Sequence, residues 1–183
     1  ERNITCPNDT VMYPLAKELS EGAGTLQGFK LKSTLVPEFC QAYTNTGSLT
    51  VMGASFLGNA YAGTTTGTLS LYNVDATFKP TTLITSVVVP ITATQGQYSA
   101  LFSSPQTVTG NYAIALKVTN ATDSILIALN NAISSTYSEG LSSLQLGGIY
   151  YAPSTPGLPG DYEPMVFPIV SYNVATDFTV SPS

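Results

Sequence analysis

The sequence predicts an all-β protein, an antiparallel β-sandwich of the jelly-roll type with about ten strands and little helix. Short stretches in which apolar and polar side chains alternate recur about every ten residues, and glycine, proline, asparagine or aspartate stands at the breaks. Only 9% of the residues are charged, so the polar surface must come from threonine, serine, asparagine and glutamine. No repeat of fixed period indicates a propeller or a solenoid.

The chain of 183 residues fits one domain preceded by a short arm. Residues 1–24 are expected to form this N-terminal arm, with a short extended piece at 10–13 and one or two helical turns at 15–21 (LAKELSE). Residues 25–183 are expected to form a single sandwich domain that ends in an extended exit segment at 177–183.

The first strands of the domain are expected at residues 25–31 and 39–43. Residues 49–57 (LTVMGASFL) carry apolar side chains on both faces, which predicts a strand covered on both sides, and Gly53 within it predicts a bulge or a close backbone approach. A loop is expected at 58–67. Strands should follow at 68–74 and 83–91, with a turn at Lys79 and Pro80 between them.

The strongest strand signal lies in residues 98–129, where a Ser-Pro break at Pro105, a turn at Gly110 and a turn before Asp123 separate apolar-alternating runs, with residues 112–119 as the middle run. In the middle run one face of an extended chain carries Tyr112, Ile114, Leu116 and Val118, and the other carries Ala113, Ala115, Lys117 and Thr119. We therefore expect a half-buried antiparallel strand at the centre of the core.

After Asn130 the pattern loosens. Residues 131–148 are rich in serine and glycine, a strand is expected to resume at 148–152, and residues 153–160 (PSTPGLPG) must form a loop. The last long strand is predicted at 162–172, where Pro168 favours an edge position or a bulge.

Composition excludes several classes of function. Eleven acidic residues against six basic ones give a net charge of −5, and no run of lysine or arginine supplies a footprint for nucleic acid. No apolar run approaches the roughly 20 residues of a membrane helix, so we expect a soluble chain without a signal peptide at its start.

The chain has no histidine, which removes the usual catalytic base near neutral pH and every nucleophile–histidine pair. Asp161 and Glu163 are the carboxylate pair to consider for glycoside hydrolysis, but such pairs usually face each other from two different elements. We therefore interpret them as a solvent-exposed acidic start of a strand, and we expect no enzyme activity.

A calcium ion is the one cofactor that the sequence suggests, because carboxylates at loops can bind this hard cation. The aspartates at predicted turns do not form a spaced motif, and capping of their own turns is the favoured interpretation. These aspartates are Asp75, Asp123, Asp161 and Asp177.

The two cysteines, Cys6 and Cys40, would tie the N-terminal arm to the first strands if they paired. We expect this disulfide if the protein is secreted, whereas in a cytosolic protein they would be two independent buried thiols.

A glycan site normally needs exposed aromatic rings, and the chain has eleven tyrosines and no tryptophan. Tyr150 and Tyr151 are adjacent, so one of them must point away from the core, and together with Tyr162 they could form a patch beside Asp161 and Glu163. The favoured alternative puts one tyrosine in the core, with its hydroxyl at the rim, and leaves the other to cover the sheet.

Five residues match acceptor patterns for glycosylation. The Asn-x-Thr pattern marks Asn3, Asn8 and Asn120 for N-glycosylation. An Asp-Ser/Thr-apolar pattern used for O-glycosylation in Bacteroidota marks Thr10 and Ser124.

The segment FSSPQTVTGNYAIAL, followed by ATDSILIALNNA, resembles a β-sandwich domain found in large secreted proteins of Bacteroidota, in which F-s-x-P-x-x-V-x-G-x-Y/F precedes D-s-x-x-L. The resemblance extends over residues 40–182, through CQAYTNTGSLTVMGASF and DYEPMVFPIVSYNVATDFTVSP. It implies export by the type IX secretion system and a role as a surface adhesin, a gliding-associated protein or an accessory domain of a polysaccharide-degrading enzyme. It implies no catalytic residue.

The sequence thus predicts a non-catalytic, secreted cell-surface domain for adhesion or glycan binding, whose partner is an extracellular glycan or protein surface. The alternative is a structural subunit of an extracellular filament or surface array, in which the chain polymerises with itself by adding a strand to a neighbour's sheet edge.

Overall fold

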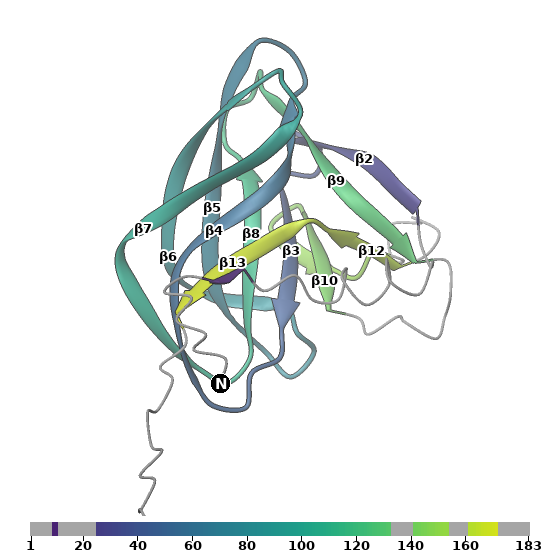
Figure 1. Ribbon diagram of the computed structural model, residues 1–183. Helices are drawn as coiled ribbons and strands as arrows, with labels where there is room; N and C mark the ends of the chain where they lie inside the picture. The colour runs from purple at the N-terminus through teal and green to yellow at the C-terminus, as the bar shows by residue number, and fades with distance from the viewer. Residues whose placement is uncertain (1–8, 11–24, 133–140, 154–160, 172–183) are drawn as a thin grey trace, which may run out of the picture.

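A computed structural model describes residues 9–10, 25–132, 141–153 and 161–171 (Figure 1). These residues form thirteen β-strands in two antiparallel sheets, which we name sheet A and sheet B, and they include no helix that could span a membrane. The all-β sandwich predicted from the sequence is confirmed. The N-terminal arm with its helical turns and the exit segment at 177–183 lie outside the described residues and stay predictions.

The strands pair in the nested order that defines a jelly roll. The second strand pairs with the ninth, the third with the eighth, the fourth with the seventh and the fifth with the sixth, and successive pairs alternate between sheets A and B. The eight strands are β2 (Thr25–Lys32), β3 (Glu38–Tyr43), β4 (Ser48–Ala60), β5 (Thr64–Val74), β6 (Pro80–Thr92), β7 (Gly96–Thr109), β8 (Tyr112–Val118) and β9 (Ser124–Ala132).

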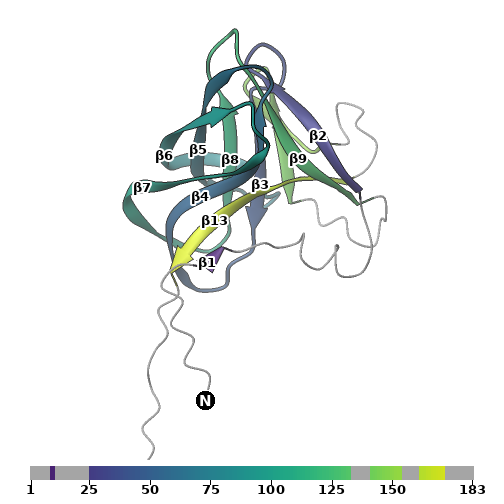
Figure 2. The ribbon, with the colours of Figure 1, turned by 45° about the horizontal axis from the view of Figure 1, so that its top comes forward.

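Both sheets carry additional strands. Sheet B has the order β11-β10-β3-β8-β5-β6, in which β10 (Ser142–Leu146) and β11 (Ile149–Tyr151) extend the jelly roll beyond β3. In sheet A, β4 and β9 pair only over Gly58–Ala60. Where they diverge, β12 (Asp161–Pro164) pairs with β9 (Figure 1), β13 (Val166–Ser171) pairs with β4, and β1 (Asp9–Thr10) pairs with β13 (Figure 2).

Strand β8 is buried on both faces, not on one as its alternation predicts. Its core-facing side chains, from Tyr112 to Val118, are buried between the sheets, but Ala113 and Ala115 on the opposite face are also 0% exposed. A second layer of side chains therefore covers the outer face of sheet B, which is the face turned away from sheet A.

Other differences from the prediction have local causes. Strands β4 and β5 run through most of the expected loop at 58–67 and meet at a short turn, where Gly63 has a φ of 63°. Pro105 does not end β7, because β7 is an edge strand and bulges against β4 between Leu101 and Gln106, where a missing amide hydrogen costs no ladder bond. Strand β10 was not predicted, because its serines hide the alternation.

The glycine and proline signals in the other strands are confirmed. A Cβ atom on Gly53 would lie 2.3 Å from the carbonyl oxygen of Ala100, and the register of β4 against β7 shifts beside it, so this glycine marks both a bulge and a close backbone approach. Pro168 lies one residue before a register shift between Ile169 and Val170, as its position in β13 predicts.

Candidate functional site

Among the described residues, the outer face of sheet B carries a buried carboxylate, that of Glu38. Strand β3 alternates between the two faces of the sheet, so Phe39 and Tyr43 enter the core while Glu38, Cys40 and Ala42 point outward. Glu38 is nevertheless 0% exposed, although it is a carboxylate on an outer face. Buried charges of this kind need specific partners.

A row of small residues crosses the middle of this face. Strand register places Ser70 beside Ala115, Ala115 beside Cys40, and Cys40 beside Ser143, on four neighbouring strands. All four side chains are buried. Because they are short, they leave room for longer side chains from both ends of the row to lie over them.

Two tyrosines reach Glu38 over this row. The Tyr72 hydroxyl, on β5, donates a hydrogen bond to Glu38 Oε1 at 3.0 Å, and the Tyr150 hydroxyl, on β11, donates one to Oε2 at 2.8 Å. The ring centroids lie 6.4 Å apart with an interplanar angle of 67°. We name Glu38, Tyr72, Tyr150 and Cys40 the Glu38 cluster. Both rings are only half-buried, so this cluster offers fixed aromatic surface to a ligand.

Neutral hydroxyls, not a cation, satisfy the Glu38 carboxylate. Lys117 is its in-register neighbour on β8, yet no ion pair joins them within the described residues. Burial and then the Glu38 charge raise the pKa of the Tyr72 hydroxyl, and burial followed by Cys40 and Glu38 raises the pKa of the Tyr150 hydroxyl. Both hydroxyls therefore stay protonated and able to donate.

The Cys40 thiol lies under the tyrosines and is chemically quiet. Burial, followed by the Glu38 charge, raises its pKa well above the usual value, although the Ser143 and Tyr150 hydroxyls oppose this. A protonated, inaccessible thiol is neither a nucleophile nor a metal ligand. In the described part of the chain no group of three or more histidine, cysteine, aspartate or glutamate side chains could hold a metal ion.

The five residues of the predicted glycan patch are divided between the two sheets. Tyr151 pairs with Leu144, which is a core residue, while Tyr150 covers the outer face of sheet B. The two rings thus face opposite sides of sheet B, and Tyr151, on the core side, is only partly buried. Tyr162 lies in the core at 8% exposure, in sheet A, so it does not join Tyr150 in a patch.

The acidic members of that patch also differ from expectation. Glu163 is only 4% exposed, so the interpretation of an exposed acidic strand start is wrong for this residue. Strand alternation turns it away from the Tyr162 side of sheet A, because the two residues are adjacent. For Asp161 the structure describes the backbone pairing with Ala132 and not the side chain.

The predicted turn cap, in which an aspartate accepts from backbone amides of its own turn, is confirmed for Asp75, whereas the printed partners of Asp123 are side chains. The Asp75 carboxylate accepts hydrogen bonds from the Thr77 amide at 2.7 Å and the Lys79 amide at 3.1 Å. Asp123 accepts bonds from the Asn120 side-chain amide at 3.0 Å and from the Thr65 hydroxyl.

Hydrogen bonds lower the pKa of both carboxyls. The largest cause is the bond from the Thr77 hydroxyl for Asp75, at 2.7 Å, and the bond from the Thr65 hydroxyl for Asp123. Of the other calcium candidates, Asp177 lies outside the described residues.

The disulfide and the glycosylation sites stay predictions. Cys40 carries a free thiol in this structure, and Cys6, Asn3 and Asn8 lie outside the described residues. Asn120 is exposed at the turn between β8 and β9, Ser124 is partly buried at the start of β9, and Thr10 is described only as part of the β1 backbone.

Sequence reasoning missed Glu38 and Tyr72. An acidic residue that begins a mostly apolar strand, and a tyrosine among the polar positions of β5, were the only signals available. Neither indicates that the two side chains meet, because that depends on the register of β3, β8 and β5.

No family model and no curated protein matches the chain. Among solved structures, the cysteine protease and lectin-like domains of Cwp84, a surface layer associated protein of Clostridium difficile, are similar at a TM-score of 0.55 and 13% identity. The match covers 82% of this chain and 36% of that chain. A clostridial Cwp84 cysteine protease after propeptide cleavage is similar at 0.53 and 12% identity, over 82% of this chain and 40% of that one. The likeness concerns the fold.

Proposed function

We propose that this protein is a non-catalytic extracellular domain that binds glycans at a cell surface, and that it does so with the outer face of sheet B. The observation that carries the proposal is the pair of half-buried tyrosine rings that Glu38 holds in place. Rings fixed before binding lose little conformational entropy when a sugar stacks on them, so they favour affinity.

The fold comparison supports this proposal. The similar solved chain combines a cysteine protease with lectin-like domains in a surface layer associated protein. An all-β sandwich without histidine corresponds in character to a lectin-like domain and not to a protease. The low fraction of charged residues and the resemblance to secreted Bacteroidota domains support the extracellular localisation in this proposal.

The chemistry of the described residues supports a binding role over catalysis. Their two fully or nearly buried glutamates, Glu38 and Glu163, lie in different sheets, and Glu38 already accepts two hydrogen bonds. A glycosidase needs two carboxyl groups that face one sugar across a cleft.

The test is a glycan array probed with the purified chain, followed by affinity electrophoresis in the polysaccharides that bind. Tyr72→Ala and Tyr150→Ala should each weaken binding about tenfold or more, as loss of a central aromatic contact does. Tyr61→Ala is the matched control, because Tyr61 is 58% exposed and directly follows β4 of sheet A. Equal binding by all four proteins, or binding to no glycan, would contradict the proposal.

A structural subunit that polymerises by strand addition is the second candidate, and the edge strand β2 favours it. All eight residues of β2 pair with β9 in unbroken register, and its other edge carries no proline or bulge. The long edge strands β6 and β7 are interrupted by Pro90 and Pro105. Polymers in negative-stain micrographs of the purified chain would support this candidate, and a monodisperse monomer would count against it.

A further inference from the structure

The two charged side chains on the outer face of sheet B differ in burial. Among the described residues of the six strands, they are Glu38 and Lys117. Glu38 is 0% exposed, so its charge acts through the low dielectric of the protein, whereas Lys117 is partly exposed and its charge is screened by water and salt. The field above the face should therefore be negative.

The neighbouring thiol responds in the same sense. The Glu38 charge raises the pKa of the Cys40 thiol more than the Lys117 charge lowers it. The Glu38 charge also raises the pKa of the Tyr72 and Tyr150 hydroxyls, after burial and, for Tyr150, after Cys40.

The tyrosine rings strengthen this preference. Each tyrosine hydroxyl donates a hydrogen bond to the same carboxylate, which pushes electron density into the ring and makes its face more negative. An interplanar angle of 67° turns two such faces in different directions within a short distance. A cation placed over either face is attracted by the ring quadrupole.

Resting on the proposed glycan-binding function, we propose that the glycan bound over Tyr72 and Tyr150 carries protonated amino groups, as in a polymer of free amino sugars. Glu38 is then a positioning residue: it holds both rings by hydrogen bonds and adds a negative charge from below without touching the ligand. Neutral sugars would bind more weakly, and acidic sugars would be disfavoured.

Oligomers of glucosamine and of N-acetylglucosamine of equal length form a matched pair that differs in charge. Isothermal titration of the full chain at about 20 and 300 mM salt should show about tenfold tighter binding of the glucosamine oligomer at low salt, and a smaller difference at high salt. An oligomer of a uronic acid serves as the acidic comparison and should bind more weakly than both.

Two charge variants should move this preference in opposite directions. Glu38→Gln keeps the size of the side chain and should remove most of the preference for the glucosamine oligomer. Lys117→Gln removes the opposing cation and should increase that preference. Lys117 is partly exposed, so this variant keeps the inference testable even if Glu38→Gln fails to fold. Thermal unfolding curves show which variants are folded.

The outcomes separate the two proposals. Equal affinity for the two matched oligomers, or tighter binding of the uronic acid oligomer, would overturn the charge inference and leave glycan binding intact. The same holds if Lys117→Gln lowers the preference. Binding of no glycan, charged or neutral, would overturn both.

Discussion

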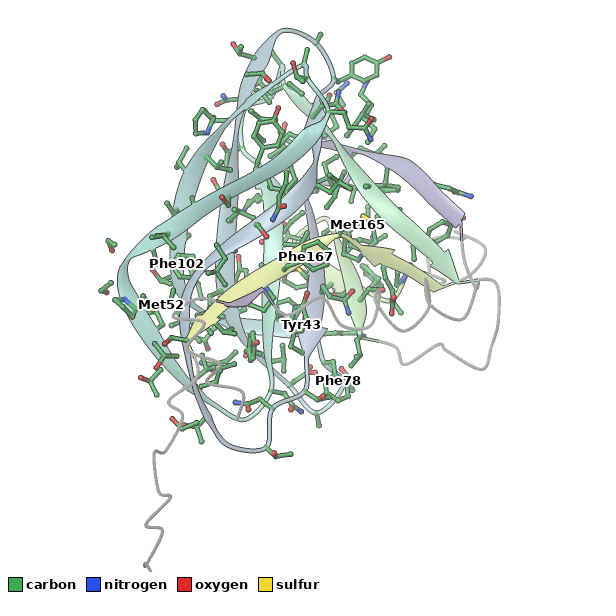
Figure 3. All side chains as sticks on the ribbon, viewed as in Figure 1. Tyr43, Met52, Phe78, Phe102, Met165 and Phe167 are labelled. Carbon is green, nitrogen blue, oxygen red and sulfur yellow. The ribbon has the colours of Figure 1, made fainter. Side chains whose placement is uncertain are left out.

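The hydroxyl of Tyr43, on β3 of sheet B, donates a hydrogen bond across the sandwich to the backbone carbonyl of Val166, on β13 of sheet A. The Tyr43 ring also stacks on Tyr112, with the centroids 5.6 Å apart. Figure 3 labels Tyr43 and, on β13, Phe167, which follows Val166 in the chain. Because β13 fills the gap where β4 and β9 diverge, this bond joins the last described strand to the opposite sheet.

We predict that Tyr43→Phe lowers the free energy of unfolding by about 1–3 kcal/mol, because it removes the donor of a buried hydrogen bond. Urea denaturation followed by fluorescence measures the change. Tyr61→Phe is the control, since Tyr61 is exposed, and it should change stability little. If both variants unfold at the same urea concentration as the parent, the cross-sheet bond contributes nothing.

Gly53→Ala should destabilise the sandwich by about 1–3 kcal/mol or more, because overpacking forces the backbone to move. The added methyl group would lie 2.3 Å from the Ala100 carbonyl oxygen and 2.8 Å from the Leu101 Cα. Gly28→Ala on β2 makes the same chemical change where no atom lies within 4 Å. Thermal melting of the two variants compares them directly, and equal melting temperatures would contradict the close approach.

Asp75 should make the fold sensitive to acid. Its hydrogen bonds to Thr77 and Lys79 lower its pKa in the folded state, so its contribution is present above the unfolded pKa of about 3.9 and is lost as pH falls through the folded pKa. Asp75→Asn should therefore be less stable than the parent at neutral pH and should approach it at strongly acidic pH. Urea midpoints measured between neutral and acid pH check this. A constant difference at every pH would show that titration of Asp75 plays no part.

Asp75 also holds a turn that contains Phe78, whose φ of 60° is costly for a residue with a side chain. The Phe78 amide donates to the Asp75 carbonyl at 3.0 Å, and its ring packs on the cluster around Ala42 and Ala113. Packing of the ring thus offsets the backbone strain. Phe78→Gly relieves the strain but loses the packing. It changes the same turn without removing a titratable group, so its effect on stability should not depend on pH and it serves as the control.

The Cys40 thiol should resist alkylation in the folded protein, because it is 1% exposed and its pKa is raised by burial. Iodoacetamide should label Cys40 only after denaturation, and an intact-mass measurement detects the added label. The same measurement without reductant tests the predicted pairing with Cys6. A mass two hydrogen atoms below that of the reduced chain, with no labelling after denaturation, would show the disulfide and contradict a free thiol.

The sequence alone was sufficient for much of the fold. Alternation in Tyr112–Val118 showed which side chains enter the core, and Gly53 marked the bulge, because these are local consequences of strand geometry. The absence of histidine also follows from the sequence alone, and it removed catalysis by a nucleophile–histidine pair from consideration. Short polar strands such as β10 escaped detection, since Ser142 and Ser143 are buried by their neighbours and not by their own hydrophobicity.

By itself, then, the sequence determined that this protein is a jelly-roll sandwich and which of its strands form the core. Only the tertiary structure decided where the candidate site lies. Tyr72 and Tyr150 come from distant parts of the chain, and they meet at Glu38 because strand register aligns Ser70, Ala115, Cys40 and Ser143 beneath them. Register depends on pairing between strands, and no local pattern of residues contains that information.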